Sequence, residues 1–441
     1  MRRFLPIIEK KMKRLSFLIA GGLFYLSCFS QAADSADRVA ASYFAEARQA
    51  SLGQKVWSLD LYGPILFVDG QSRTTWANEP DSAGILKPAG GVYRGILPNE
   101  VLLANTAITW EGKQWSLILW PLPANRDDRV NLMLHECFHR IQERLGLPQN
   151  TPTANHLSTM DGRIYYLLEL QALRAALSLP VDQRGPDLAN ALLFREKRHV
   201  LFPVTFDNER ILETSEGLAE YTGVILGRQP DSIRQHLFQQ IDSSAGRKSL
   251  IRSFEYVSGP VYGYLLFEKD PRWTSRLDSS VSLPALISAY YHPGQPKVLT
   301  DQDLTAAVDK YNGKAIIHSE QVKEEDRRKM VQQYVDLFTR QPTVKIELEK
   351  MNISFNPSIL IDLEEYGTIY PIAIVKDTWG RVEVTEGGLL MKDWKVIWLP
   401  LSSDPQPSDQ LVTGKGWKLA LNKGWKIVKS DKLHYIVVQG N

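Results

Sequence analysis

The chain has 441 residues, 44% of them hydrophobic, and its 52 basic side chains nearly balance its 50 acidic ones. This near-neutral charge argues against a nucleic-acid-binding protein, which normally concentrates basic residues in a stripe or patch. The hydrophobic share is that of an ordinary globular protein, and the length suffices for two or three domains.

Residues 1–32 have the pattern of a secretory signal peptide. A basic segment that ends at Arg14 is followed by the apolar run LSFLIAGGLFYLSCF and by small residues up to Ala32 that are suited to cleavage. A start at Met12 would give a more compact signal. The apolar run is shorter than the roughly 20 residues of a membrane-spanning helix, so we expect an exported protein with no stable membrane span after cleavage.

The expected location is the periplasm, with secretion or a lipid anchor on Cys28 as the alternatives. The residues before Cys28, Tyr25-Leu26-Ser27, match a lipidation motif poorly. Signal cleavage would leave Cys137 as the sole cysteine, so we expect no internal disulfide.

Residues 33–124 predict a mainly β region after a short N-terminal helix. The segments LYGPILFVDG and ITWEGKQWSLILWPLP are strand-like, and Glu111-Gly112 is suited to a hairpin turn. The glycines and prolines of residues 84–100 predict loop or bulge structure. The strand QWSLILWP is either an exposed edge that pairs with an extended substrate or an ordinary strand within a sheet.

Residues 125–340 predict a mainly helical domain, and residues 341–441 predict a C-terminal all-β domain. The fold class is therefore α+β. Asn125 is suited to cap the first helix, whose first turn is acidic. Further helices are expected at 160–179, 186–200, 208–227, 230–243, 252–268, 281–291, 301–311 and 319–340.

The first of these helices carries the stretch NLMLHECFHRIQERLG, residues 131–146. On a helical wheel His135 and His139 share one face, Glu136 lies beside them, and Cys137 belongs to a separate apolar arc. Two imidazoles one turn apart can bind one tetrahedral zinc ion, and the glutamate between them can take a proton from a metal-bound water. The alternative to a zinc site is a solvated helix face. Because Cys137 belongs to the apolar arc, we expect it to be a buried hydrophobic residue and not a metal ligand.

A catalytic zinc site needs a third protein ligand. The helix predicted at 208–227 places Glu216 and Glu220 one turn apart, with Glu213 on the same face. Carboxylates stacked in this way repel one another, and a nearby cation would remove the conflict. The alternative is a solvated acidic face that Arg210 partly neutralises.

The two segments together resemble a known family. HECFH followed at a distance by SEGLAEY is similar to the gluzincin zinc metallopeptidases, the thermolysin and aminopeptidase N group. The resemblance implies a zincin-like metallopeptidase domain in which Glu216 is the third ligand of one zinc ion per chain. It also implies that Glu220 orients a histidine ligand.

A third segment, FEYVSGPVYGYLLFEKD, is similar to the helix that carries the oxyanion-stabilising tyrosine in the aminopeptidase N branch. The resemblance assigns that role to Tyr256, with Tyr262 and Tyr264 as alternatives. Two departures weaken an aminopeptidase reading. Ser215 replaces the usual asparagine before the ligand glutamate, and the motif that holds a substrate's free amine is absent from the sequence.

The leading hypothesis is therefore an exported zinc metallopeptidase that acts on a peptide or protein substrate, with Glu136 as general base. One alternative is a zinc hydrolase of esters or of amides outside peptides. The other is a non-catalytic scaffold whose C-terminal β domain binds glycans or a protein partner through exposed tryptophans. Within that domain the Trp-Lys pairs at Trp394, Trp417 and Trp425 echo one another, which indicates either repeated hairpins or the ordinary alternation of edge strands.

Overall fold

The structure is a computed structural model that describes residues 35–247, 249–293, 300–356, 359–406 and 409–440. The predicted signal peptide, with Cys28, lies outside these residues. The fold is α+β, with a helical middle and a C-terminal region of strands, and it divides into two compact units between Ile316 and Ile317. In the described part of the chain, no helix has the length and apolar character that crossing a membrane requires.

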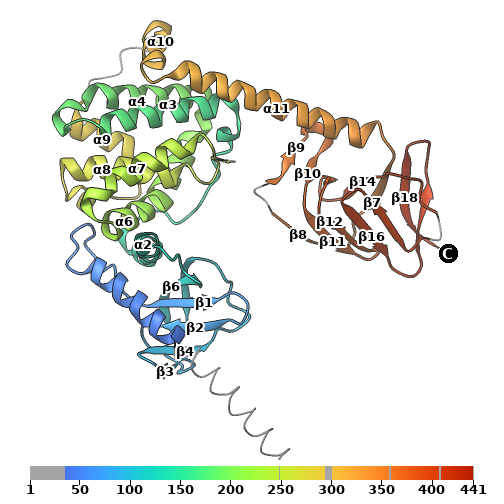
Figure 1. The fold of residues 1–441 in the computed structure, drawn as a ribbon, viewed down its shortest axis with the longest axis horizontal. Helices are drawn as coiled ribbons and strands as arrows, with labels where there is room; N and C mark the ends of the chain where they lie inside the picture. Colours follow the sequence, from blue (N-terminus) through green and yellow to red (C-terminus); the bar gives the residue numbers. More distant parts are fainter. Residues whose placement is uncertain (1–34, 248, 294–299, 357–358, 407–408, 441) are drawn as a thin grey trace, which may run out of the picture. The chain divides into compact units, whose positions relative to one another are not determined.

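The first unit begins with a helix over residues 35–51 and a six-stranded sheet (Figure 1). The strands follow the order β3-β4-β2-β1-β6-β5, and all neighbours are antiparallel except β1 and β6. The hairpin turn at Glu111-Gly112 is confirmed, since both residues have positive φ. The strands are β1 (Ile65–Asp69), β2 (Thr74–Ala77), β3 (Lys87–Ala89), β4 (Val92–Ile96), β5 (Thr106–Trp110) and β6 (Lys113–Trp120).

Two expectations for this sheet are decided by its strand order and turns. Of the two alternatives for QWSLILWP, the ordinary strand within a sheet holds, because β6, which includes residues 114–120, lies between β1 and β5. The edge strand beside it is β5. Within residues 84–100, predicted as loop or bulge, residues 87–96 form the hairpin of β3 and β4 instead, and Gly90 and Gly91 adopt the positive φ values of 56° and 91° that its tight turn requires.

Helix α2 (Arg126–Gln142) packs against the sheet through strand β6. The Ser116 hydroxyl donates to the backbone oxygen of Glu136 over 3.0 Å. The predicted N-cap is confirmed, because the Asn125 side chain accepts a hydrogen bond from the backbone N–H of Asp128. In Figure 1, α2 lies between the sheet and the helices that follow it in the first unit. The sheet therefore packs on one side of α2, and the later helices of the first unit pack on the other side.

The helices after α2 begin and end within three residues of the predicted ranges, apart from α11, which begins six residues before the predicted 319, and from one local change. The segment predicted as a single helix at 208–227 contains a π-helical turn at Glu213–Gly217 between α5 and α6. The helices are α3 (Met160–Leu177), α4 (Gly185–Leu201), α5 (Phe206–Leu212), α6 (Leu218–Gly227), α7 (Pro230–Ser244), α8 (Glu255–Lys269), α9 (Leu283–Tyr291), α10 (Asp301–Lys310) and α11 (Gly313–Thr339).

Helix α8 approaches the π-helical turn so closely that only glycine fits at the contact. A Cβ atom on Gly259 of α8 would lie 2.3 Å from the Cα atom of Gly217. This distance is below any that real Cβ atoms adopt, and the obstacle is backbone, which cannot move aside. The glycine pair therefore fixes α8 directly against the turn that carries Glu216.

The second unit contains two sheets that share one hydrophobic core. A seven-stranded sheet has the order β17-β18-β7-β14-β13-β10-β9, and a five-stranded sheet has the order β15-β16-β12-β11-β8. The strands are β7 (Thr343–Glu347), β8 (Asn352–Phe355), β9 (Ile361–Asp362), β10 (Thr368–Tyr370), β11 (Ala373–Asp377), β12 (Gly380–Val384), β13 (Leu389–Lys392), β14 (Val396–Pro400), β15 (Leu411–Gly414), β16 (Trp417–Leu421), β17 (Trp425–Lys429) and β18 (His434–Gln439).

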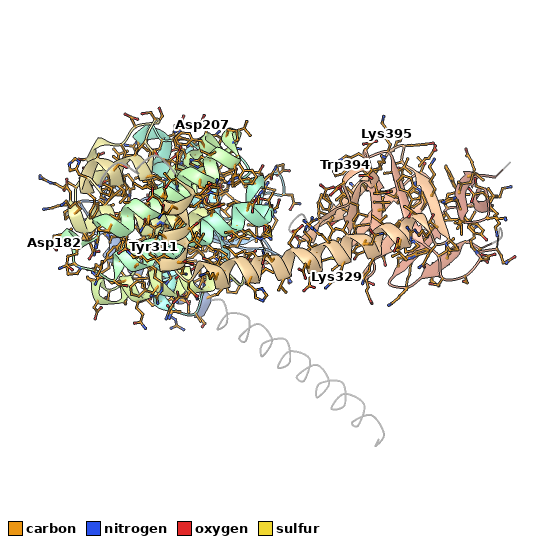
Figure 2. All side chains as sticks on the ribbon, turned by 90° about the horizontal axis from the view of Figure 1, so that it is seen from above. Asp182, Asp207, Tyr311, Lys329, Trp394 and Lys395 are labelled. Atoms are coloured by element: carbon orange, nitrogen blue, oxygen red, sulfur yellow. The ribbon has the colours of Figure 1, made fainter. Side chains whose placement is uncertain are left out.

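The three tryptophans of the Trp-Lys pairs differ in exposure. Trp417 is buried in the core between the sheets, and Trp425 packs against that core. Trp394 lies at the surface of the second unit, in the turn between β13 and β14, and is 54% exposed (Figure 2). Of the three, Trp394 alone presents most of its side chain to solvent.

Candidate metal centre

Three side-chain atoms converge in the first unit: Nε2 of His135, Nε2 of His139 and Oε2 of Glu216. The two nitrogens lie 3.1 Å apart. The carboxylate oxygen lies 3.4 Å from the nitrogen of His135 and 3.5 Å from that of His139. Ligand atoms bonded to a tetrahedral zinc ion at about 2.0–2.1 Å are about 3.4 Å from one another. The three atoms therefore have the spacing of one face of a zinc coordination tetrahedron.

Each histidine uses its other ring nitrogen for a hydrogen bond. Nδ1 of His135 lies 3.1 Å from a carboxylate oxygen of Glu220, and Nδ1 of His139 lies 2.7 Å from Oε1 of Gln142. Both partners are oxygen acceptors, so both Nδ1 atoms donate. A neutral ring then directs the bare lone pair of its Nε2 atom toward Glu216. The two Nε2 atoms and the Glu216 oxygen are then three electron-pair donors that face one point and repel one another. A shared cation removes this repulsion, so these residues fit a zinc ion.

The close approach of histidines and carboxylates also shifts the pKa values of His135 and Glu216. Burial lowers the pKa of His135, but the carboxylates of Glu216 and Glu220 stabilise the protonated ring, outweigh burial and raise the pKa to about 10. Burial acts to raise the pKa of Glu216, yet the positive charge that the two histidines carry when protonated holds it well below its ordinary value. The cluster thus favours a positive charge at its centre, which either a proton or a metal ion can supply.

Glu136 lies on α2 between the two histidines and is 4% exposed. Its Oε2 atom has no hydrogen-bond partner among the described residues. Burial raises the pKa of this carboxyl group, the two histidines oppose the shift, and Glu216 and Glu220 add to it. A buried carboxylate with a raised pKa and an unused oxygen is suited to exchange a proton with a bound molecule.

Cys137, the next residue along α2, faces the hydrophobic core and is fully buried. Burial raises the pKa of its thiol to about 11. A protonated thiol is a poor metal ligand, and the three converging atoms do not include its sulfur. The prediction that Cys137 is a buried hydrophobic residue is confirmed.

Of the three candidate tyrosines on α8, Tyr256 is the one that reaches the cluster. Its hydroxyl donates to Oε2 of Glu216 over 2.7 Å, and its ring stacks parallel to that of His135 at 5.7 Å. Tyr262 is fully buried and donates instead to Glu169, and Tyr264 stacks on Phe267. Burial and the neighbouring Glu216 raise the pKa of Tyr256, so its hydroxyl remains a donor.

The prediction that Glu213 shares the acidic face of Glu216 and Glu220 is wrong. A π-helical turn holds more residues than an α-helical turn, and it therefore rotates Glu213 away from the cluster. The Glu213 carboxylate accepts hydrogen bonds from Arg195 at 2.6 and 2.9 Å and from the hydroxyl of Ser258 at 2.6 Å. Its charge is thus neutralised by arginine and not by a metal ion.

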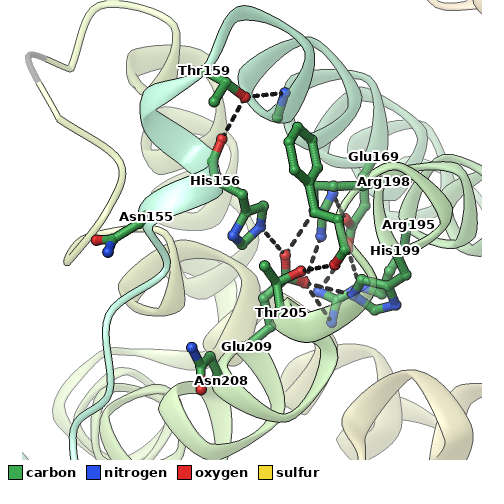
Figure 3. Close-up of polar contacts among 12 residues, drawn as sticks. Asn155, His156, Thr159, Glu169, Arg195, Arg198, His199, Thr205, Asn208 and Glu209 are labelled. Carbon is green, nitrogen blue, oxygen red and sulfur yellow. Dashed lines mark hydrogen bonds and ion pairs between the residues drawn. The ribbon is translucent and has the colours of Figure 1, made fainter. Parts of the chain in front are cut away.

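Glu213 belongs to a buried ionic network that anchors the segment before Glu216. Arg198 is fully buried and binds Glu169 of α3 at 2.7 Å and Glu209 of α5 at 2.8 Å (Figure 3). Glu209 also accepts from His156 at 2.6 Å and contacts His199 at 3.1 Å. The network therefore fixes α5 to α3 and α4.

A cavity of about 590 Å³ opens in front of the cluster. Its wall includes Glu136, Tyr256 and the three converging residues, together with Asn105, Thr106 and Ala107 at the start of edge strand β5. The cavity thus places the buried carboxylate of Glu136 and the candidate metal centre beside the edge strand of the sheet.

Two residues of the site were not predicted, Asn131 and Gln142. Asn131 donates to Glu220 over 2.8 Å, and Gln142 accepts from His139. Both lie on α2 within about 40° of His135 on a helical wheel, on the histidine face. Their position on the same polar face of the helix as the histidines is the sequence feature that could have identified them.

Comparison of the chain with models of protein families, with curated proteins and with solved structures finds no match. Its function therefore has to be inferred from the side chains of this site.

Proposed function

We propose that the protein is a zinc-dependent hydrolase of the gluzincin type that cleaves peptide bonds with water. The observation that carries this proposal is the convergence of two Nε2 atoms and one carboxylate oxygen beside the buried carboxylate of Glu136. Three protein ligands with an adjacent general base are the elements of a catalytic zinc site. The signal-like N-terminus supports action outside the cytoplasm.

In this proposal His135, His139 and Glu216 hold one zinc ion, which supplies a Lewis acid and lowers the pKa of a bound water. Glu136 accepts the proton of the attacking water and delivers it to the leaving amine. Glu220 holds His135 in the required tautomer through Nδ1. Tyr256 donates a hydrogen bond to the oxygen of the scissile carbonyl as negative charge develops on it.

The open edge of β5 favours a peptide substrate over an ester or another amide. Residues Thr106 and Ala107 belong both to this edge and to the cavity wall. The backbone groups of an edge strand can pair with an extended chain, and such pairing recognises peptides irrespective of their side chains. A small ester could not use this edge.

Metal analysis of the purified protein tests the proposal. We expect about one zinc ion per chain, and hydrolysis of unfolded polypeptides that stops on chelation and returns with added zinc. Peptidase activity that persists after complete zinc removal would overturn the metal mechanism. A protein that binds no zinc would overturn the proposed function as a whole.

Replacing Tyr256 by phenylalanine is expected to lower kcat by about 10²-fold with little change in KM, because an oxyanion donor acts in the transition state. Steady-state kinetics on a fluorogenic peptide would measure the effect, with Tyr165→Phe on α3 as the control. If the hydroxyl served only to hold Glu216, zinc affinity would fall in its place and kcat of the zinc-saturated variant would stay normal.

A further inference from the structure

The side chain of Gln142 connects the two chain segments that supply the metal ligands. Gln142 is 1% exposed, and its Oε1 atom accepts from Nδ1 of His139 over 2.7 Å. Its Nε2 atom donates to the hydroxyl oxygen of Ser215, at 3.2 Å, and to the backbone oxygen of Pro148. One buried amide thus contacts a ligand on α2 and the residue directly before Glu216.

The backbone oxygen of Pro148 determines which way this amide points. A carbonyl oxygen can only accept, so it must face the amide NH₂ group and not the amide oxygen. The oxygen of Gln142 is thereby turned toward His139, where it in turn requires a proton on Nδ1. The proton on Nδ1 leaves Nε2 of His139 with a lone pair directed at the cluster.

The end of α2 is shaped to bring Pro148 back over Gln142. Gly146 adopts φ 71°, its N–H donates to the backbone oxygen of Glu143, and the N–H of Leu147 donates to the backbone oxygen of Gln142. These two bonds form a Schellman motif, which reverses the chain after the helix. The amide orientation is therefore set by backbone atoms that are themselves fixed.

We propose that Gln142 is a positioning residue of the zinc site, which holds His139 in its metal-binding tautomer and couples it to the Glu216 segment. This inference rests on the proposed function. It also gives a role to Ser215, which departs from the asparagine of the resembling family: its small hydroxyl accepts the second hydrogen of the Gln142 amide.

Zinc affinity, measured by competition with a chromophoric chelator, tests the inference without any assay of catalysis. Gln142→Met keeps the side-chain length but removes the hydrogen bonds, and we expect zinc to bind about 10- to 100-fold more weakly. Gln54→Met is the matched control, because Gln54 also bonds backbone groups, at Trp57 and Leu59, in a loop outside the cavity wall. Its zinc affinity should equal that of the wild type.

Side-chain ¹⁵N shifts of the zinc-loaded wild-type protein give a second readout that does not depend on the folding of a variant. We expect His139 to carry its proton on Nδ1 and to bind zinc through Nε2. The opposite tautomer, or a Gln142→Met protein that binds zinc as tightly as the wild type, would overturn the inference and leave the proposed function intact. A wild-type protein without zinc affinity would overturn both.

Discussion

Replacing Glu136 by glutamine is expected to reduce kcat/KM for peptide hydrolysis by about 10³-fold, the scale of a lost general base. Glutamine has the same size but cannot take a proton from water. Zinc should remain bound, because Glu136 does not supply any of the three converging atoms. Stability should not fall either, because the unpartnered buried Oε2 atom of Glu136 loses no hydrogen bond.

The measurement pairs peptide kinetics with metal analysis on the same preparation. Glu143→Gln is the control, since Glu143 is exposed just after α2 and should leave both quantities unchanged. Full activity in Glu136→Gln would contradict the mechanism. Loss of zinc from the variant would mean that Glu136 helps to hold the metal, and its role would have to be reassigned.

Replacing Arg198 by methionine is expected to destabilise the first unit by about 3–5 kcal/mol, the usual cost of removing one partner from a buried ion pair. Arg198 is fully buried between Glu169 and Glu209, and methionine fills much of its volume without any charge. The two carboxylates would then share a single neighbouring arginine, Arg195. The melting temperature should fall by about 10 °C.

The control is Arg174→Met on α3, because Arg174 makes a similar two-point contact with Asp242 on the surface, at 2.7 and 3.0 Å. Exposed pairs of this kind contribute at most about 1 kcal/mol. Equal melting temperatures for Arg198→Met and Arg174→Met would contradict a stabilising role for the buried network.

The effect of Arg198→Met should also depend on pH. Burial acts to raise the pKa of Glu209 and Glu169, but the arginines outweigh it and lower both pKa values. A depressed carboxyl pKa stabilises the native state above the unfolded pKa of about 4.3, and this stabilisation is lost as the pH falls below it. Without Arg198 the carboxyl groups should protonate at higher pH. The stability difference between wild type and variant should therefore shrink from pH 7 toward pH 4, as thermal unfolding in matched buffers would measure.

The predictable parts of this protein are those with local signals. The cap at Asn125 and the spacing of apolar residues lie within one segment, so α2 and the later helices could be located from sequence. The same holds for His135 and His139, which one helical turn brings together wherever the helix lies. Glu216 was identified through its resemblance to a motif, and the geometry now places it beside both histidines.

The features that escaped prediction depend on other parts of the chain. Whether β5 or β6 forms the edge of the sheet is decided by the pairing of β6 with β1, about 50 residues earlier in sequence. The partners of Glu213 in the π-helical turn are Arg195 of α4 and Ser258 of α8, which lie 18 and 45 residues away in sequence. The role of Gln142 depends on the path of the chain after α2, which brings Pro148 back to it.

The π-helical turn has a consequence for how this segment tolerates changes of length. Upstream of it Glu209 is held by the arginines, and downstream Glu220 is held by His135. An α-helix advances by about 100° per residue, so deleting one residue of the turn would rotate one end against the other by about that angle. Such a shortened chain could keep the contact of Glu209 with the arginines or the contact of Glu220 with His135, but not both. The additional residue of the turn thus sets the rotation of α6 relative to α5.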